Sequence, residues 1–186
     1  MSTANWNALL LAGGRSTRMG RDKAMLDWHG QPLLAAQLQH LKQLGATQLR
    51  VSGDYPEYGG IPDTHPDLGP IGGLHGALAA ATDGCWLVVP IDMPVLQWSH
   101  LQPLIEAPPA LSAICYRHHM LPLRLILDDR VRMLLNVLID RPDPQLGRSL
   151  RALHAGLAGA YIDCPNALLA GLSNCNTPQE WQALSQ

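Results

Sequence analysis

The sequence predicts an α/β fold with a mostly parallel central sheet, because strand-like and helix-like segments alternate along it. Residues 8–11 (ALLL) and 85–89 (CWLVV) are short continuous apolar runs, which are typical of strands buried on both faces. Between them, Leu34, Leu38 and Leu41 recur at helical spacing. A helix therefore follows the first strand and completes a βα unit.

The rest of the chain continues this alternation. The first helix opens at Gln31-Pro32 and closes at Gly45, and a strand over 49–51 and a helix after the glycines at 69–73 follow it. After the strand at 85–89 we expect a hairpin over 111–116 and 121–127. The last expected elements are a helix from Asp128 or Asp129, a short helix over 149–154 and a strand at 161–162. Residues 55–70 are rich in proline and glycine and are expected to form a loop without regular structure. Thr177, Pro178 and Glu180 fit the capping box of a last helix.

Length and composition limit the function classes. The 186 residues suffice for one full-sized core, so we expect a single domain over residues 1–186. A net charge of −2 gives no overall field for binding nucleic acid. The start of the chain has no cationic leader and no apolar run of membrane-spanning length, so we expect a cytoplasmic protein without membrane contact. Four cysteines without C-x-x-C spacing indicate neither disulfides nor a zinc site.

A glycine turn followed by cations is the first candidate site. Gly13 and Gly14 end the first strand, and Arg18 and Lys23 follow within ten residues. Glycine permits a turn whose backbone N–H groups approach a phosphate closely, and the cations suit a polyanion such as a triphosphate. Neither G-x-G-x-x-G nor G-x-x-x-x-G-K-[ST] is matched, which disfavours a dinucleotide oxidoreductase and a P-loop NTPase.

Two further segments are suited to a phosphate substrate. Gly72 and Gly73 lie at a helix N-terminus, where free N–H groups favour an anion. Asp92 follows the central strand, and the carboxyl ends of parallel strands are where open α/β sheets bind ligands. Its carboxylate suits Mg²⁺, which usually takes one or two carboxylates together with substrate phosphates. We therefore expect Asp92 to be the metal ligand.

Four motifs give a resemblance to a known family. LAGGRSTRMGRDKAML over residues 11–26 resembles the signature of the nucleotidyltransferase family typified by molybdenum cofactor guanylyltransferase. GPIGG at 69–73, PIDMP at 90–94 and NCNTP at 174–178 are similar to the second, third and fourth motifs of that family. The resemblance implies a Rossmann-like three-layer α/β/α nucleotidyltransferase fold. It also implies GTP as nucleotide, molybdopterin as acceptor and a recipient molybdoenzyme, or its chaperone, as partner.

The same resemblance assigns roles to individual residues. Nucleotide-binding positions are Leu11, Ala12, Gly13, Gly14, Lys23, Ser52, Asp63 and Asp92. Catalytic positions are Arg18, Lys23 and Asp92, with Asp92 as the magnesium ligand. Positions expected to contact the pterin substrate are Gly72, Gly73, Asn174 and Asn176. Ser52 stands where the family often has asparagine, and its shorter side chain reaches less far toward a base.

The expected reaction is attack by an acceptor phosphate on the α-phosphorus of the nucleoside triphosphate, with loss of pyrophosphate. An ionised acceptor needs no general base, so catalysis rests on positioning and on charge stabilisation. Two alternatives remain at this stage. One is another enzyme of the same fold, a cytidylyltransferase for the same pterin or a sugar-phosphate nucleotidyltransferase. The other is a non-catalytic nucleotide- or pterin-binding partner of a molybdoenzyme.

Overall fold

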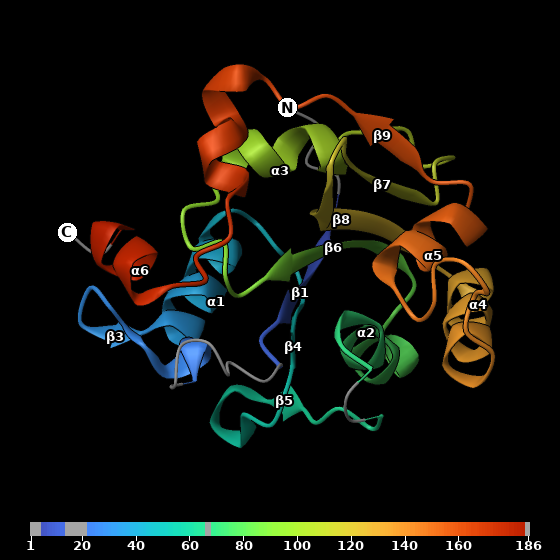
Figure 1. Ribbon diagram of the computed structural model, residues 1–186, viewed down its shortest axis with the longest axis horizontal. Helices are drawn as coiled ribbons and strands as arrows, with labels where there is room; N and C mark the ends of the chain where they lie inside the picture. Colours follow the sequence, from blue (N-terminus) through green and yellow to red (C-terminus); the bar gives the residue numbers. More distant parts are fainter. Residues whose placement is uncertain (1–4, 14–21, 66–67, 185–186) are drawn as a thin grey trace.

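A seven-stranded sheet forms the centre of the computed structural model, which describes residues 5–13, 22–65 and 68–184 (Figure 1). In spatial order the strands are β5 (Gly60–Ile61), β4 (Leu49–Ser52), β1 (Asn7–Leu11), β6 (Gly84–Pro90), β8 (His119–Leu127), β7 (Ala113–Tyr116) and β9 (Ala160–Ile162). β8 is antiparallel to both of its neighbours, and the other paired strands are parallel. The prediction of a mostly parallel α/β sheet is confirmed.

Helices cover both faces of this sheet (Figure 1). They are α1 (Leu33–Gln43), α2 (Pro70–Ala79), α3 (Trp98–Ile105), α4 (Asp129–Asp140), α5 (Leu150–Gly156) and α6 (Pro178–Leu184), with 3₁₀ turns η1 (Lys23–Met25), η2 (Pro56–Tyr58) and η3 (Asn166–Leu172). A small hairpin joins β2 (Asp27–Trp28) to β3 (Gln31–Pro32). No helix in the described ranges is both long and apolar enough to cross a bilayer.

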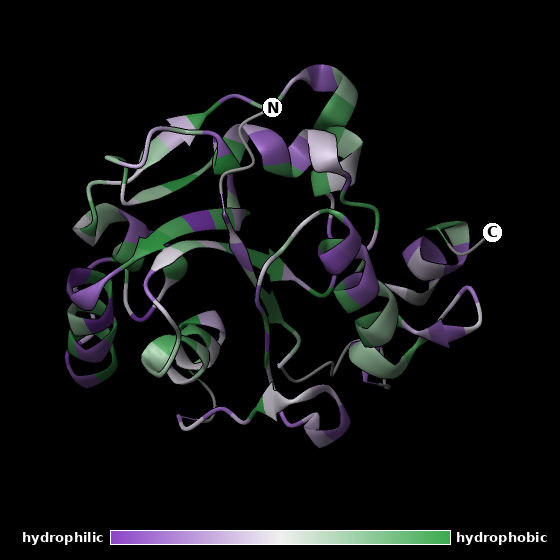
Figure 2. Cartoon of the chain, turned by 180° about the vertical axis from the view of Figure 1, so that it is seen from behind, coloured by the Kyte–Doolittle hydropathy of each residue, from purple (hydrophilic) through white to green (hydrophobic). Residues whose placement is uncertain are grey.

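The alternation of side chains along β1 builds the two halves of the core. Leu9 and Leu11 point to the face that packs against α2, α4 and α5. Ala8 and Leu10 point to the opposite face, which packs against α1 and α3. Both faces of β1 are buried, as the continuous apolar run predicted. Figure 2 shows hydrophobic residues along the central strands and hydrophilic segments on α4.

Two expectations about local structure were wrong, and one helix was not expected from the sequence. Residues 55–70 contain η2 and β5, and β5 extends the sheet by pairing with β4. The glycines that argued against regular structure instead let the chain turn sharply: Gly59 has a φ of 64°. Gln31 and Pro32 belong to β3, so the first helix begins only at Leu33. No helix was expected at α3, because it contains Pro103 and is therefore hard to recognise as a helix.

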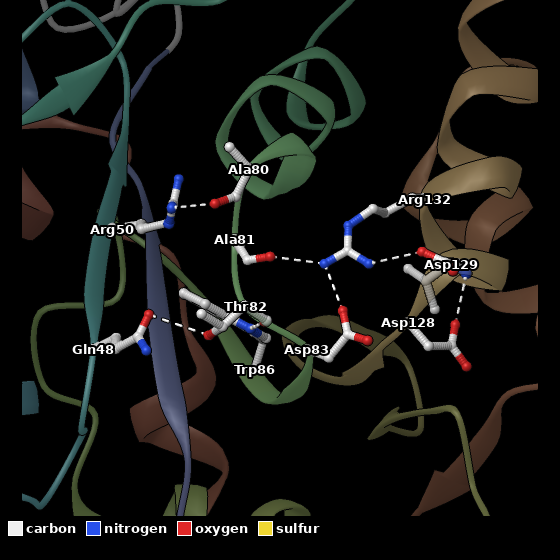
Figure 3. A network of polar contacts seen from close by, with 11 residues as sticks. Gln48, Arg50, Ala80, Ala81, Thr82, Asp83, Trp86, Asp128, Asp129 and Arg132 are labelled. Carbon is white, nitrogen blue, oxygen red and sulfur yellow. Dashed lines mark hydrogen bonds and ion pairs between the residues drawn. The ribbon is translucent and has the colours of Figure 1, made fainter.

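Two arginines hold the C-terminal end of α2 (Figure 3). Arg50 donates to the carbonyls of Ala77 (3.1 Å) and Ala80 (2.7 Å). Arg132 donates to the carbonyl of Ala81 at 2.7 Å and pairs with Asp83 at 2.7 Å. Cations at this end satisfy the free carbonyls and complement the helix dipole. At its other end, α2 packs on Ser52 at the end of β4.

Candidate active site

Three strand ends meet at one edge of the sheet. Leu11, the last residue of β1, is in register with Ser52 of β4 and Pro90 of β6. The segments that follow remain bonded: Ile91 N–H donates to the Leu11 carbonyl at 3.0 Å, and Gly13 N–H donates to the Ser52 carbonyl at 2.7 Å. The carboxyl ends of β1, β4 and β6 therefore meet at a single edge of the sheet.

Lys23 and Asp92 lie together at this edge. Lys23 opens the turn η1, whose N-cap is Asp22, and its Nζ lies 3.9 Å from Asp92 Oδ2. Their side chains are only 13% and 21% exposed. The same Nζ donates to Asn176 Oδ1 at 2.6 Å. A half-buried cation, a carboxylate and an amide from three distant parts of the chain therefore converge.

Asp92 has a polar atom that the described residues leave unpaired. Its Oδ1 is buried and has no hydrogen-bond partner in the described part of the chain. Burial raises the pKa of Asp92 above its usual range, and the charge of Lys23 acts in the opposite direction. Buried carboxylate oxygens are normally paired or bound to a metal, so this oxygen is suited to bind a ligand.

Mg²⁺ matches this donor set. Among the residues that the structure describes, no cluster of three or more His, Cys, Asp or Glu side chains is arranged to hold a metal. A single carboxylate with a free oxygen is sufficient for Mg²⁺, because water and substrate phosphates supply its other ligands. A site of this kind is completed only when the phosphate substrate is present.

The segment before α6 is bonded to Asp92 at one point and to α6 at another. Cys175 N–H donates to the Asp92 carbonyl at 2.7 Å. Glu180 Oε2 accepts from the N–H groups of Asn176 and Thr177 at 2.7 and 2.9 Å, and Glu180 N–H donates to Thr177 Oγ1. These backbone donors hold the pKa of Glu180 below its usual value. The predicted capping box is confirmed, and it orients Asn176 toward Lys23.

A second group of predicted residues is tightly packed at the N-terminus of α2 and consists of Ser52, Asp63, Gly72 and Gly73. Ser52 is 3% exposed, and a Cβ on Gly73 would overlap its Oγ. A Cβ on Gly72 would lie 2.8 Å from both carboxylate oxygens of Asp63. Asp63 Oδ1 also accepts from His65 N–H at 2.8 Å. The two glycines are therefore needed for close contact with residues expected to bind the nucleotide.

The four residues expected to contact the pterin are thus divided between two places. Gly72 and Gly73 belong to α2, which packs on one face of the sheet. Asn174 and Asn176 belong to the segment between Leu172 and Trp181, both of which pack on the other face. Asn174 is exposed, whereas Asn176 contacts Lys23. The structure brings Asn176 to the Lys23–Asp92 pair and leaves the glycines with Ser52 and Asp63.

Three of the remaining predicted residues, Leu11, Ala12 and Gly13, lie at the end of β1 or directly after it. Leu11 and Ala12 are buried, and Ala12 N–H donates to the Ser52 carbonyl at 3.1 Å. The N–H of Gly13 is likewise engaged with that carbonyl, so it is not a free donor for a phosphate. Gly14 and Arg18 lie outside the described residues. Their expected roles stay predictions.

One residue at this edge was missed by the sequence analysis. The hydroxyl of Tyr55 donates to Asp22 Oδ1 at 2.9 Å and lies 3.3 Å from the Ala12 carbonyl. Burial and the neighbouring Asp22 raise the pKa of Tyr55 above its usual value, so the hydroxyl stays protonated. The signal for it was weak: a tyrosine between Gly53 and Gly60 in a segment interpreted as irregular loop.

Comparison with known proteins gives a consistent result. Residues 8–158 match the family described as the MobA-like NTP transferase domain. The molybdenum cofactor guanylyltransferase of Xanthomonas euvesicatoria pv. vesicatoria is 46% identical over 180 residues, covering 96% of this chain and 94% of that protein. The protein of the same name from Pseudomonas fluorescens is 34% identical over 192 residues, covering 96% and 93%.

Solved structures share the fold at lower identity. Molybdopterin-guanine dinucleotide biosynthesis protein A from Archaeoglobus fulgidus superposes with a TM-score of 0.71 at 21% identity, covering 96% of each chain. The 2-C-methyl-D-erythritol 4-phosphate cytidylyltransferase of Thermus thermophilus gives a TM-score of 0.69 at 15% identity, covering 97% of each chain. At these identities the likeness concerns the fold alone, and it agrees with the three-layer arrangement around the sheet.

Proposed function

The chain belongs to the MobA-like NTP transferase family, and on that premise we propose that it transfers GMP from GTP to molybdopterin and releases pyrophosphate. The product is the guanine dinucleotide form of the molybdenum cofactor. Membership of the family makes the chain a nucleotidyltransferase. The names of its relatives support the choice of GTP and molybdopterin. The observation that carries the proposal is the half-buried Lys23–Asp92 pair at the strand ends, with its unpaired carboxylate oxygen.

The reaction needs one bond to form and one to break. An oxygen of the acceptor phosphate attacks the α-phosphorus of GTP, and the bond from the α-phosphorus to the bridging oxygen of the β-phosphate breaks. The acceptor phosphate is already ionised at neutral pH, so no side chain has to remove a proton. Lys23 provides positive charge beside the phosphates as negative charge builds up on the leaving pyrophosphate. Arg18 would add to that charge.

Asp92 is the residue that would hold Mg²⁺, through its unpaired Oδ1. When bound, the ion neutralises phosphate charge and fixes the orientation of the triphosphate. Asn176 accepts a hydrogen bond from Lys23 and so limits the directions in which its ammonium group points. Ser52, Asp63, Gly72 and Gly73 shape the wall for the nucleotide by close packing. The polar groups of this wall and of the charged pair lie on two sides of the same sheet edge.

The setting of the reaction follows from the same premise. We place it in the cytoplasm, where GTP is available and where the free thiols of all four cysteines stay reduced. The chain would act as one domain over residues 1–186. The dinucleotide product would then be delivered to a recipient molybdoenzyme or to its chaperone.

Pyrophosphate release tests the proposal. Purified protein is supplied with molybdopterin and with GTP, CTP, ATP or UTP in turn, in the presence and absence of Mg²⁺. The expected result is release with GTP that depends on Mg²⁺ and on the acceptor. Preference for CTP would replace the guanylyl assignment by a cytidylyl one. Binding of nucleotide without any pyrophosphate release would favour the non-catalytic partner.

A further inference from the structure

The hydroxyl of Tyr55 joins two segments that approach the site from different directions. It donates to Asp22 Oδ1 at 2.9 Å and lies 3.3 Å from the carbonyl of Ala12. Ala12 immediately follows β1, and Asp22 immediately precedes Lys23. One phenol therefore ties the end of the central strand to the residue beside the predicted catalytic lysine.

Asp22 in turn restrains the backbone of Lys23. The same Oδ1 accepts from Ala24 N–H at 3.0 Å and caps the turn η1, which begins at Lys23. Ala24 is fully buried in the core that contains Leu10 and Leu33. The backbone of Lys23 is thus held between a capped N-terminus and a buried neighbour. A shift of Asp22 would move the point from which the lysine side chain extends.

The chain around Tyr55 leaves room for its ring. Gly53 has a φ of 128°, and a Cβ there would lie 2.6 Å from Tyr55 Cε2. A Cβ on Gly60 would lie 2.8 Å from Tyr55 N. Tyr55 N–H donates to the Gly53 carbonyl at 3.0 Å, and Gly60 N–H donates to the Tyr55 carbonyl at 2.9 Å. Gly53 therefore leaves room for the Tyr55 ring, and Gly60 leaves room for the backbone of Gly53 and Tyr55.

We propose that Tyr55 is a positioning residue for nucleotidyl transfer, which acts by fixing Asp22 and, through it, the turn that carries Lys23. The inference rests on the proposed function, because it assumes that Lys23 contacts the phosphates. This role needs no contact between Tyr55 and either substrate, because it acts through Asp22. Its hydroxyl sets the place of Lys23 relative to the end of β1, and hence relative to Asp92 on the neighbouring strand end.

The test removes only the hydroxyl. In Tyr55→Phe the ring still fills its space, and kcat/KM for GTP falls about tenfold, because a misplaced reacting group loses much of the advantage of orientation. KM for molybdopterin and the melting temperature stay close to those of the wild type. Tyr58→Phe is the matched control, since the Tyr58 hydroxyl has no hydrogen bond to the described residues and lies three positions along the same loop. It is expected to leave all of these quantities unchanged.

A double-mutant cycle shows whether Tyr55 acts through Asp22. Asp22→Asn weakens the same hydrogen bond from the other side, so the double variant Tyr55→Phe/Asp22→Asn is expected to lose little more activity than the stronger single variant. Additive losses would overturn the route through Asp22. Wild-type GTP kinetics in Tyr55→Phe would overturn the proposal. A melting temperature that falls together with equal losses for GTP and for the acceptor would overturn it as well, by showing a purely structural role.

Equilibrium binding separates this inference from the proposed function. The affinity for GTP in the presence of Mg²⁺ is titrated without acceptor, so no turnover is needed. If the wild type makes no product with any nucleotide, the proposed function fails. About tenfold weaker GTP binding by Tyr55→Phe than by Tyr58→Phe would still support the positioning role, because Lys23 would be the phosphate contact that is disturbed. Equal binding by the two variants would contradict it.

Discussion

The two halves of the candidate site differ in how their polar groups are satisfied. In the glycine half, formed by Ser52, Asp63, Gly72 and Gly73, the backbone of one element lies directly against the side chains of another. In the charged half, formed by Lys23, Asp92 and Asn176, a buried carboxylate oxygen has no partner among the described residues.

This difference indicates that the glycine half determines the shape of the site and the charged half its chemistry. The glycine half is complete without a ligand, because its contacts are made within the protein and depend on the absence of a Cβ. The charged half is incomplete, because a buried ionisable group without a full set of partners destabilises the fold. We infer that changes in the charged half affect turnover without damaging the fold, whereas changes in the glycine half affect the fold and nucleotide binding together.

The largest effect is expected at Lys23. Lys23→Ala removes the cation that we propose lies beside the phosphates, and kcat should fall by about 10³-fold or more, because charge stabilisation of the transition state is lost. The circular dichroism spectrum should stay that of the wild type. Turnover at the wild-type rate would refute the role of Lys23 and would remove the basis for calling this half the chemical one.

Asp92→Asn should lower turnover to a comparable degree without lowering the stability of the fold. Transfer falls by about 10²-fold or more as the expected Mg²⁺ ligand is lost. Because burial raises the pKa of Asp92 in the folded state, its contribution to stability is fully present below the unfolded-chain pKa and is lost as pH rises through the folded-state pKa. The uncharged variant should therefore be at least as stable as the wild type at neutral pH without Mg²⁺.

Denaturant unfolding at several pH values, in buffer containing a chelator, measures this difference. The gap between Asp92→Asn and the wild type should close in acid. With GTP present, Mg²⁺ should raise the melting temperature of the wild type and leave that of the variant unchanged. A variant that is less stable than the wild type at neutral pH would show that Asp92 is needed for folding rather than for metal binding.

The glycine half is tested by Gly73→Ala. The new Cβ would overlap Ser52 Oγ, so the variant should lose about 1–3 kcal/mol of stability, as overpacked sites do, and should bind GTP more weakly. Gly76→Ala in the same helix is the control. Its Cβ would lie 3.5 Å from the Pro62 carbonyl, which is ordinary contact, and alanine should stabilise the helix by up to about 1 kcal/mol.

A second substitution sharpens this result. Ser52→Ala removes the atom that Gly73→Ala overlaps, so the double variant should recover much of the lost stability. Calorimetry and a GTP titration on the same preparations give both quantities. Stability equal to the wild type in Gly73→Ala alone would mean that this half is not tightly packed, and the distinction between the halves would fail.

The smallest effect is expected at Asn176. Asn176→Ala removes the 2.6 Å hydrogen bond to Lys23 but keeps the charge, so kcat should fall by only about tenfold. KM for molybdopterin distinguishes the two possible roles of this residue. An unchanged KM with a lower kcat supports positioning of Lys23, whereas a raised KM with unchanged kcat supports the direct pterin contact that the sequence suggested.

The sheet and its edge could be predicted because their signals are local. Residues 8–11 and 85–89 are continuous apolar runs, and they became the adjacent strands β1 and β6. Thr177 and Glu180 are three positions apart, and their capping box formed as expected. By contrast, β5 has only two residues and depends on pairing with β4. A strand that short has no pattern of its own.

The side-chain contacts of the site could be predicted only in part. Lys23 and Asp92 each lie within a recognisable motif, and the geometry of parallel strands brings the two motifs together. The bond between Lys23 and Asn176 joins residues 153 positions apart, and that between Tyr55 and Asp22 joins residues 33 apart. No local sequence pattern signals a contact between residues so far apart. Such contacts depend on how α6 and the loop after β4 pack, which only the folded chain determines.

The product itself tests the central claim most directly, which is that this sheet edge joins a guanylyl group to a pterin phosphate. Molybdopterin is incubated with wild-type protein, Mg²⁺ and an equimolar mixture of the four nucleoside triphosphates, and the products are identified by mass spectrometry. The account predicts the guanine dinucleotide, formed by the wild type and absent with Lys23→Ala and with Asp92→Asn. A cytosine dinucleotide, or a guanine dinucleotide formed equally by all three proteins, would contradict it.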